Sequence, residues 1–280
     1  MPPFRYVVCD VFTDTPLQGN QVAVFTDARE LPEHLLQALA REMNFSETVF
    51  VYPPEQGGHA KMRIFTPSVE VPFAGHPALG TAFVLSGPLQ LIEIRLETGR
   101  GIVPVRLDRE GPRITFGRME QPLPTIEPFP AERELLAAVG VERSLLPVEL
   151  YDNGIRHVYV CLGSPAEVAA LRPDVARLES LGTVGVNCFA GEGRSWKTRM
   201  FAAGHGVAED PATGSAAGPL ALHLARHRRI AFGDEIEISQ GGEIDRPSTL
   251  YALAEGSQER VERIEVGGSA VVVARGEFRL

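Results

Sequence analysis

The sequence contains two passages with one layout, and this internal repeat constrains the fold more than any other feature. Each passage has an Arg-x-Phe at the end of a strand-like run, at Arg63 and at Arg199. Each then has a turn that delivers a glycine, Gly75 or Gly214, into an Ala/Leu-rich helix. The arginines lie 136 residues apart and the glycines 139, close to half of the 280-residue chain. Such self-similarity predicts two copies of one α+β unit.

The segments around the two passages repeat the same order of elements. We expect strands at 4–12, 22–25 and 48–52 in the first half, and at 155–162 and 184–189 in the second. A helix is expected at about 32–44, and Ser164-Pro165-Ala166-Glu167 is a capping-box signature that starts another. Hairpins are expected at 101–116 and 270–276.

A proline-rich segment lies between the halves. Residues 121–130 contain four prolines, which predicts a linker. We therefore expect two domains, 1–122 and 123–280. A C-terminal strand at about 267–280 is placed in the second, with the alternative that it returns to the first.

The composition excludes several classes of function. The formal charge is −9 and the longest basic run is only residues 226–229, so no nucleic-acid partner is expected. No apolar run approaches the roughly 20 residues of a membrane span, and the first residues do not look like an export signal. Three widely spaced cysteines (Cys9, Cys161 and Cys188) form no CxxC pair, which favours buried thiols in a reducing cytoplasm.

The two glycine turns together predict a ligand site. The first N–H groups of a helix have no partner within the helix and lie at the positive end of its dipole. Two such turns related by a pseudo-twofold axis would meet between the halves and hold a small carboxylate. His76, Asp210 and Ser215 are the adjacent side chains. Taken singly, each turn is better explained as structural, and it is the repetition that favours a site.

These turns resemble the phenazine-biosynthesis PhzF-like family. The matching stretches are 73–77 (FAGHP) and 209–216 (EDPATGSA), together with Gly19-Asn20, Ser46-Glu47-Thr48, Gln240-Gly241 and Arg246-Pro247-Ser248. They occur in family order over nearly the whole chain. The resemblance implies an α+β, diaminopimelate-epimerase-like fold of two similar domains related by a pseudo-twofold axis, each a mostly antiparallel sheet wrapped around a central helix. It places the active site between the domains and implies a homodimer.

Glu47 is the candidate proton carrier. In a strand it shares a face with Val49 and Val51, and a carboxylate on an apolar face has a raised pKa that suits proton transfer. The residues alone favour an exposed acid at the start of a strand. The resemblance reverses this, because the family's general acid/base is the Glu of this motif. It also implies a site made of catalytic Asp210 and His76 and of substrate-binding Gly75, Gly214, Thr213, Ser215 and Asn20.

The two halves differ in a way that bears on mechanism. The second half has no acid near 182–185, where the repeat of Glu47 is expected. Related epimerases use one cysteine at each glycine turn, where this chain has Ala74 and Thr213. We therefore expect an isomerase of a small amino or hydroxy carboxylic acid that needs neither metal nor cofactor. The resemblance implies the isomerisation of trans-2,3-dihydro-3-hydroxyanthranilate as the model reaction. A non-catalytic carboxylate-binding protein and an amino-acid racemase or epimerase remain alternatives.

Three further features receive no role in the reaction. His223 and His227 are four residues apart on an expected helix, and the neighbouring arginines favour a solvated helix end over a metal pair. His205 is either a residue near the site or part of a surface loop. Arg246-Pro247-Ser248 matches the family without an evident chemical task.

Overall fold

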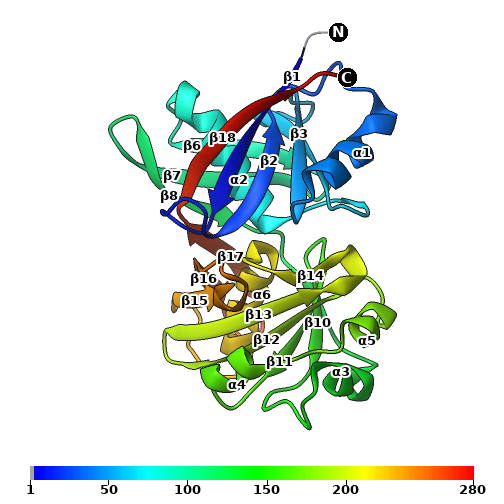
Figure 1. Ribbon diagram of the computed structural model, residues 1–280. Helices are drawn as coiled ribbons and strands as arrows, with labels where there is room; N and C mark the ends of the chain where they lie inside the picture. The colour runs from blue at the N-terminus through cyan, green and yellow to red at the C-terminus, as the bar shows by residue number, and fades with distance from the viewer. Residues whose placement is uncertain (1–2) are drawn as a thin grey trace.

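The computed structural model describes residues 3–280 and has two lobes (Figure 1). We define the first lobe as β1 to β8 with β18, and the second as β9 to β17. The first lobe contains β1 (Phe4–Val11), β2 (Asn20–Phe25), α1 (Glu33–Met43), β3 (Glu47–Tyr52), β4 (Ala60–Phe65), β5 (Glu70–Val71), α2 (Gly75–Leu89), β6 (Glu93–Thr98), β7 (Gly101–Glu110), β8 (Arg113–Glu120) and β18 (Ala270–Phe278). The second contains β9 (Thr125–Pro128), α3 (Glu132–Val139), β10 (Glu149–Asp152), β11 (Arg156–Cys161), α4 (Pro165–Ala170), α5 (Val175–Ser180), β12 (Gly185–Glu192), β13 (Ser195–Ala202), β14 (Val207–Asp210), α6 (Gly214–Arg226), β15 (Ile236–Gln240), β16 (Ser248–Gly256) and β17 (Val261–Gly268).

The two lobes repeat one order of strand pairing. Along β1-β2-β3-β4-β6-β7-β8 the orientations are antiparallel, parallel, antiparallel, parallel, antiparallel and antiparallel. The series β10-β11-β12-β13-β15-β16-β17 has the same orientations in the same order. The α+β fold of two similar units, each with a mostly antiparallel sheet, is therefore confirmed.

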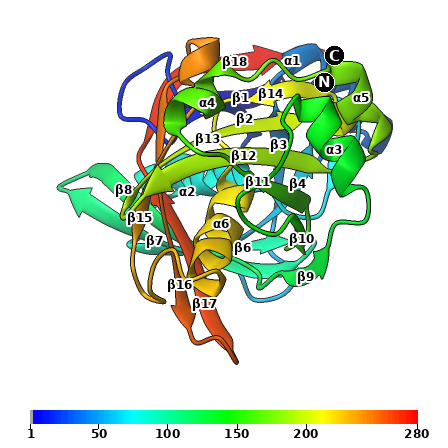
Figure 2. The same cartoon turned by 90° about the horizontal axis from the view of Figure 1, so that it is seen from below.

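Each sheet wraps around one apolar helix. All twelve residues from Gly214 to Ala225 of α6 are buried, and so are the first ten of α2. A helix that is apolar on every side has to be enclosed. Figure 2 shows α6 surrounded by the strands of the second lobe, and α2 packs against β1, β2 and β8 of the first.

The last strand of the chain lies against its first. β18 pairs antiparallel with β1 from Phe278 opposite Phe4 to Ala270 opposite Val11, so the first and last strands of the described chain lie side by side (Figure 1). The predicted hairpin at 270–276 is wrong, because β18 continues through Gly276. This glycine lies opposite Tyr6, and a Cβ there would come within 2.6 Å of the Tyr6 ring. Gly276 therefore makes room for the Tyr6 side chain and does not form a turn.

The proline-rich segment 121–130 is a linker only in part. Thr125–Pro128 forms β9, which pairs with β10, and an edge strand tolerates proline because one side needs no N–H donor. Gln121 is buried, and its Nε2 donates to the Gly214 carbonyl at 2.8 Å. The segment is therefore part of the second lobe and of its contact with α6.

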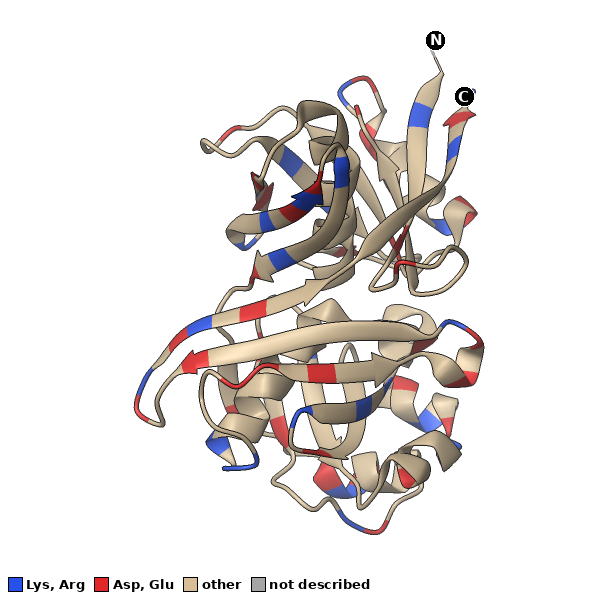
Figure 3. Cartoon of the chain, turned by 90° about the vertical axis from the view of Figure 1, so that its left-hand side faces the viewer, with Lys and Arg blue, Asp and Glu red and all other residues tan. Residues whose placement is uncertain are grey.

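Acidic and basic residues are interspersed on both lobes in Figure 3. Neither sign is confined to one lobe in that view, and acidic residues outnumber basic ones in the sequence, 36 to 27. No helix within residues 3–280 has the length and apolarity needed to cross a membrane. The three cysteines are buried free thiols, as predicted, and burial raises the pKa of Cys161 to about 11 and that of Cys188 to about 12.

Candidate active site

The starts of the two central helices touch each other. A Cβ on Gly75 would lie 2.4 Å from the Ser215 backbone nitrogen and 2.5 Å from the Gly214 carbonyl carbon. Only glycine permits this approach. Neither helix start is capped by a side chain. Two positive dipole ends with free N–H groups therefore meet at one place, which favours a negatively charged ligand there.

A small pocket lies beside this contact, between the lobes. Its volume is about 30 Å³, close to the space of one water molecule. The pocket is lined by Ser46, Glu47 and Thr66 from the first lobe and by Ile155, His157, Gly185, Met200, Ala202, His205, Val207, Asp210, Thr213 and Ser215 from the second. Both lobes are therefore needed to form its walls.

Glu47 is the first residue of β3 and enters the pocket from the first lobe. Its side chain is 13% exposed, and its Oε2 lies 3.4 Å from His76 Nε2. This oxygen has no hydrogen-bond partner. Burial, with the nearby charge of Asp210 adding to it, raises the pKa of Glu47 well above its usual value. A raised pKa makes the carboxylate a stronger base, which suits a group that carries a proton.

His76 and Asn20 lie directly behind Glu47. His76 follows Gly75 at the start of α2, and burial lowers its pKa to about 3, so its imidazole is neutral. Asn20 Nδ2 lies 3.1 Å from His76 Nδ1 and donates to Asp210 Oδ1 at 2.8 Å. Asn20 thus connects the first-lobe histidine with the second-lobe carboxylate.

Asp210, at the end of β14, differs from Glu47 in its hydrogen bonds. It accepts from Ser46 Oγ at 2.7 Å, from Thr213 Oγ1 at 2.5 Å and from Asn20. Burial raises the pKa of Asp210, but these three donors oppose the effect because they stabilise the ionised form. Asp210 therefore has three donors that favour its ionised form, whereas Glu47 Oε2 has none.

The internal repeat places Gly185 at the position that matches Glu47. Each begins its strand, and the register sets Glu47 opposite Val22 and Gly185 opposite His157. A Cβ on Gly185 would lie 2.7 Å from His157 Nδ1. The second lobe consequently has no room for an acid at this position, and the pocket has no symmetry-related counterpart of Glu47.

His157 is a pocket residue that sequence reasoning missed. Its Nε2 lies 2.9 Å from Ser215 Oγ, and burial lowers its pKa to about 3. Ser215 occupies the position in α6 that His76 occupies in α2, so the repeat has diverged into a Glu47–His76 pair and a His157–Ser215 pair. The available signal was a polar residue at the start of an otherwise apolar strand. His205 also lines the pocket, and burial lowers its pKa.

The eight predicted site residues thus fall into three groups. Glu47, Asp210, Thr213 and Ser215 line the pocket, His76 and Asn20 lie behind it, and Gly75 and Gly214 form the contact between the helices. All eight lie within one continuous set of contacts.

His223 and His227 do not form the predicted solvated helix end. His223 is fully buried, and both imidazoles contact Glu149 Oε2, at 3.3 Å and 2.9 Å. Arg226 Nη1 donates to the same oxygen at 2.8 Å. Burial alone would raise the pKa of Glu149, but the hydrogen bonds from these three residues hold it well below its usual value. The prediction was wrong because the sheet encloses α6 up to its last turn.

Comparison with known proteins agrees with this geometry. The family model described as phenazine biosynthesis-like protein matches residues 9–276. A trans-2,3-dihydro-3-hydroxyanthranilate isomerase of Pseudomonas aeruginosa is 53% identical over 276 residues, 99% of both chains. A Bacillus anthracis structure of the PhzF family superposes over the full length of both chains, with a TM-score of 0.83 and 26% identity.

A more distant structure shares the fold alone. It is a hydroxyproline epimerase from Agrobacterium vitis, with a TM-score of 0.70 and 12% identity over 99% of this chain and 91% of that one. The full-length family match and the 53% identity decide the classification. The chain belongs to the phenazine biosynthesis-like PhzF family and is an isomerase.

Proposed function

We propose that this isomerase acts on trans-2,3-dihydro-3-hydroxyanthranilate or a close analogue, and that Glu47 moves one proton between two carbons on the same face of the substrate. One observation carries the proposal. The pocket contains a single acid without stabilising donors, and the matching position, Gly185, cannot hold a second. A full-length relative at 53% identity bears the name of this reaction.

The substrate carboxylate would bind at the joined helix starts. The N–H groups near Gly75 and Gly214 supply uncapped donors, and Ser215 Oγ lies beside them. If His157 Nε2–H donates to Ser215 Oγ, the serine proton is free to point at the ligand. Apolar side chains at Ile155 and Met200 would contact the ring. This arrangement presents one face of a small cyclic acid to Glu47.

Proton transfer requires Glu47 in its ionised form. Asn20 Nδ2 can only donate, so its contact of 3.1 Å with His76 Nδ1 places the proton of the neutral imidazole on Nε2. This N–H faces Glu47 Oε2 at 3.4 Å and would stabilise the carboxylate. The Glu47 carboxylate takes a proton from one carbon and returns it to another, so it ends the cycle ionised as it began. Side chains supply every donor and acceptor, so the step needs no metal or cofactor.

A two-thiol racemase is not favoured by this site. Such a mechanism needs a thiol on each face of the reacting carbon. The residues that precede the two helices, where these thiols would lie, are Ala74 and Thr213, and neither is a cysteine. The cysteines lie buried in strands β1, β11 and β12. One carboxyl group serving one face is suited to isomerisation.

Turnover in deuterated water tests the role of Glu47. We expect Glu47→Gln to keep its fold and its affinity for a carboxylate ligand while losing deuterium incorporation into the product by NMR. Glu167→Gln, on the exposed α4, is the matched control and should exchange normally. Deuterium uptake that survives in Glu47→Gln would remove Glu47 from this role. Ligand-induced thermal shifts without any C–H exchange in the native protein would instead favour a binding protein.

We also propose a cytoplasmic homodimer. The three free, buried thiols are suited to a reducing compartment. Leu89, the last residue of α2, and Ile92, in the loop that follows, are 64% and 74% exposed and offer an apolar contact. Light scattering on the purified protein tests the dimer, and a monomeric mass at micromolar concentration would contradict it.

A further inference from the structure

Arg246, for which the sequence suggested no task, joins the two lobes beside the catalytic residues. It lies in the second lobe just before β16, and its side chain is 17% exposed. Its Nε donates to the Gly19 carbonyl at 2.9 Å, and its Nη2 donates to the Gln18 carbonyl at 2.7 Å and to Asp10 Oδ1 at 2.8 Å. One guanidinium therefore binds three acceptors of the first lobe.

Asp10 secures the same loop from the opposite side. This buried carboxylate also accepts from the Leu17 backbone N–H at 2.7 Å. The loop is tightly folded, with Leu17 and Gly19 both at φ +69°, and a Cβ on Gly19 would lie 2.3 Å from the Val11 carbonyl. The Gly19 N–H donates to the Pro247 carbonyl at 3.1 Å. Contacts to Arg246 and Pro247 thus define the loop conformation.

The residue that follows this loop is Asn20. Its Nδ2 donates to Asp210 Oδ1 and to the Ala212 carbonyl, each at 2.8 Å. The two residues that precede it in the chain, Gln18 and Gly19, are those whose carbonyls Arg246 binds. The arginine itself lies outside the residues that line the pocket.

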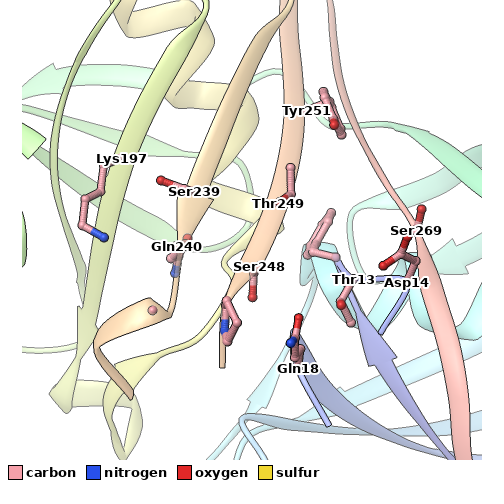
Figure 4. A pocket seen from close by; sticks show the side chains of 13 residues that line it. Thr13, Asp14, Gln18, Lys197, Ser239, Gln240, Ser248, Thr249, Tyr251 and Ser269 are labelled. Atoms are coloured by element: carbon pink, nitrogen blue, oxygen red, sulfur yellow. The ribbon is translucent and has the colours of Figure 1, made fainter. Parts of the chain in front are cut away.

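The other end of the Arg246 segment contacts Asp210 directly. Gln240 Nε2 donates to the Asp210 carbonyl at 2.8 Å. Gly241 has φ +79°, and a Cβ there would lie 2.3 Å from the Arg246 carbonyl and 2.5 Å from that of Pro211. Figure 4 shows Gln240, Ser248 and Gln18 around a hollow between the lobes, of about 380 Å³. Segment 240–248 is thus packed against Asp210 and Pro211 at one end and against the loop that precedes Asn20 at the other.

We propose that Arg246 is a positioning residue, which sets Asn20 between His76 and Asp210 by binding the carbonyls of Gln18 and Gly19. The inference rests on the proposed function of the pocket. It predicts an effect on proton transfer without contact with the substrate. Without Arg246, Asn20 would no longer be held where it donates to Asp210. Asp210 would lose a hydrogen bond that stabilises its ionised form, so the pKa of Asp210 would rise.

Three variants test this role by steady-state kinetics. We expect Arg246→Ala to lower kcat at least tenfold, to change KM less than threefold, and to move the acidic limb of the kcat/KM profile to higher pH. Asn20→Ala should do the same, and the double variant should be no worse than either single one, because both act through one contact. Arg118→Met, which removes another inter-lobe ion pair, with Glu235, is the matched control and should leave kcat and the pH profile unchanged.

Two further measurements separate positioning from a general structural role. Methylguanidinium at millimolar concentration should restore part of the kcat of Arg246→Ala, and Arg246→Lys should stay impaired because an ammonium cannot match the planar fork. Hydrogen exchange at the Leu17 and Gly19 amides should accelerate in Arg246→Ala but not in Arg118→Met. Additive losses, an unmoved pH profile or unchanged exchange would overturn the inference. The exchange result does not depend on turnover, so it stands apart from failure of the proposed reaction.

Discussion

The contact between the two helix starts provides the sharpest test of the site geometry. We predict that Gly75→Ala pushes the lobes apart. The added Cβ would lie 2.4 Å from the Ser215 nitrogen and 2.7 Å from the Gly214 Cα. Ordinary contacts begin near 3.4 Å. All three nearest atoms are backbone, so no side-chain rotation relieves the clash, and the helix starts have to separate by about 1 Å.

The effect on catalysis should exceed the effect on stability. A displacement of about 1 Å between reacting groups costs on the order of 100-fold in rate. Overpacking of this kind destabilises by about 1–3 kcal/mol, which for a chain of this size lowers Tm by roughly 2–10 °C. We therefore expect Gly75→Ala to fold, to melt somewhat earlier, and to lose about two orders of magnitude in kcat/KM.

Gly87→Ala is the matched control, because it makes the same change in the same helix. A Cβ at Gly87 meets nothing within 4 Å. Alanine is favoured over glycine inside a helix, but Pro88 follows and disfavours the helical conformation of a residue with a Cβ. The two effects oppose each other, so this variant should change Tm little and turn over normally.

The assay follows conversion of trans-2,3-dihydro-3-hydroxyanthranilate by proton NMR, with Tm from calorimetry. A Gly75→Ala enzyme within threefold of the native kcat/KM would refute the idea that the helix contact fixes the catalytic distances. Equal losses in both variants would point to α2 as a whole rather than to its start.

Three further predictions concern single groups. Glu47→Gln should raise Tm at pH 8 but not at pH 4. The pKa of Glu47 is raised in the folded state, so ionising this group costs stability as the pH rises above its pKa in the unfolded chain, by about 1.4 kcal/mol for each pKa unit. A difference in Tm that does not depend on pH would contradict this. His157→Phe should raise KM about tenfold with a small change in kcat, because it removes the hydrogen-bond partner of the Ser215 hydroxyl. An unchanged KM would argue against a role of the His157–Ser215 hydrogen bond in substrate binding. Iodoacetamide should not inactivate the native enzyme, because burial keeps Cys9, Cys161 and Cys188 as unreactive thiols; activity lost in step with alkylation would contradict this.

The sequence predicted the parts of the fold that depend on neighbouring residues. The repeated Arg-x-Phe is an example, since each arginine pairs with an acid close along the chain, Arg63 with Glu70 and Arg199 with Glu209. Each guanidinium also lies over the aromatic ring two residues on. The repeat is therefore a structural device at the end of β4 and of β13, and this is why it was visible in sequence.

Contacts between residues far apart in the sequence could not be predicted from it. The task of His157 depends on its register with Gly185 across a parallel strand pair. Burial of His223 depends on the sheet around α6, where its ring stacks on Tyr159 at 5.5 Å. Arg246 contacts carbonyls more than 220 residues away in the chain. No local pattern encodes such contacts, because periodicity reports which face is apolar and not what lies opposite.

The return of β18 to β1 has a consequence for how the protein is made. On the ribosome, β1 emerges before every other strand of the described chain, yet its pairing partner on one side, β18, follows all the others. The second lobe has every strand of its own sheet available once Gly268 has emerged. The nascent chain therefore carries an unpaired edge on β1 until β18 has emerged, and the first lobe is completed after the second.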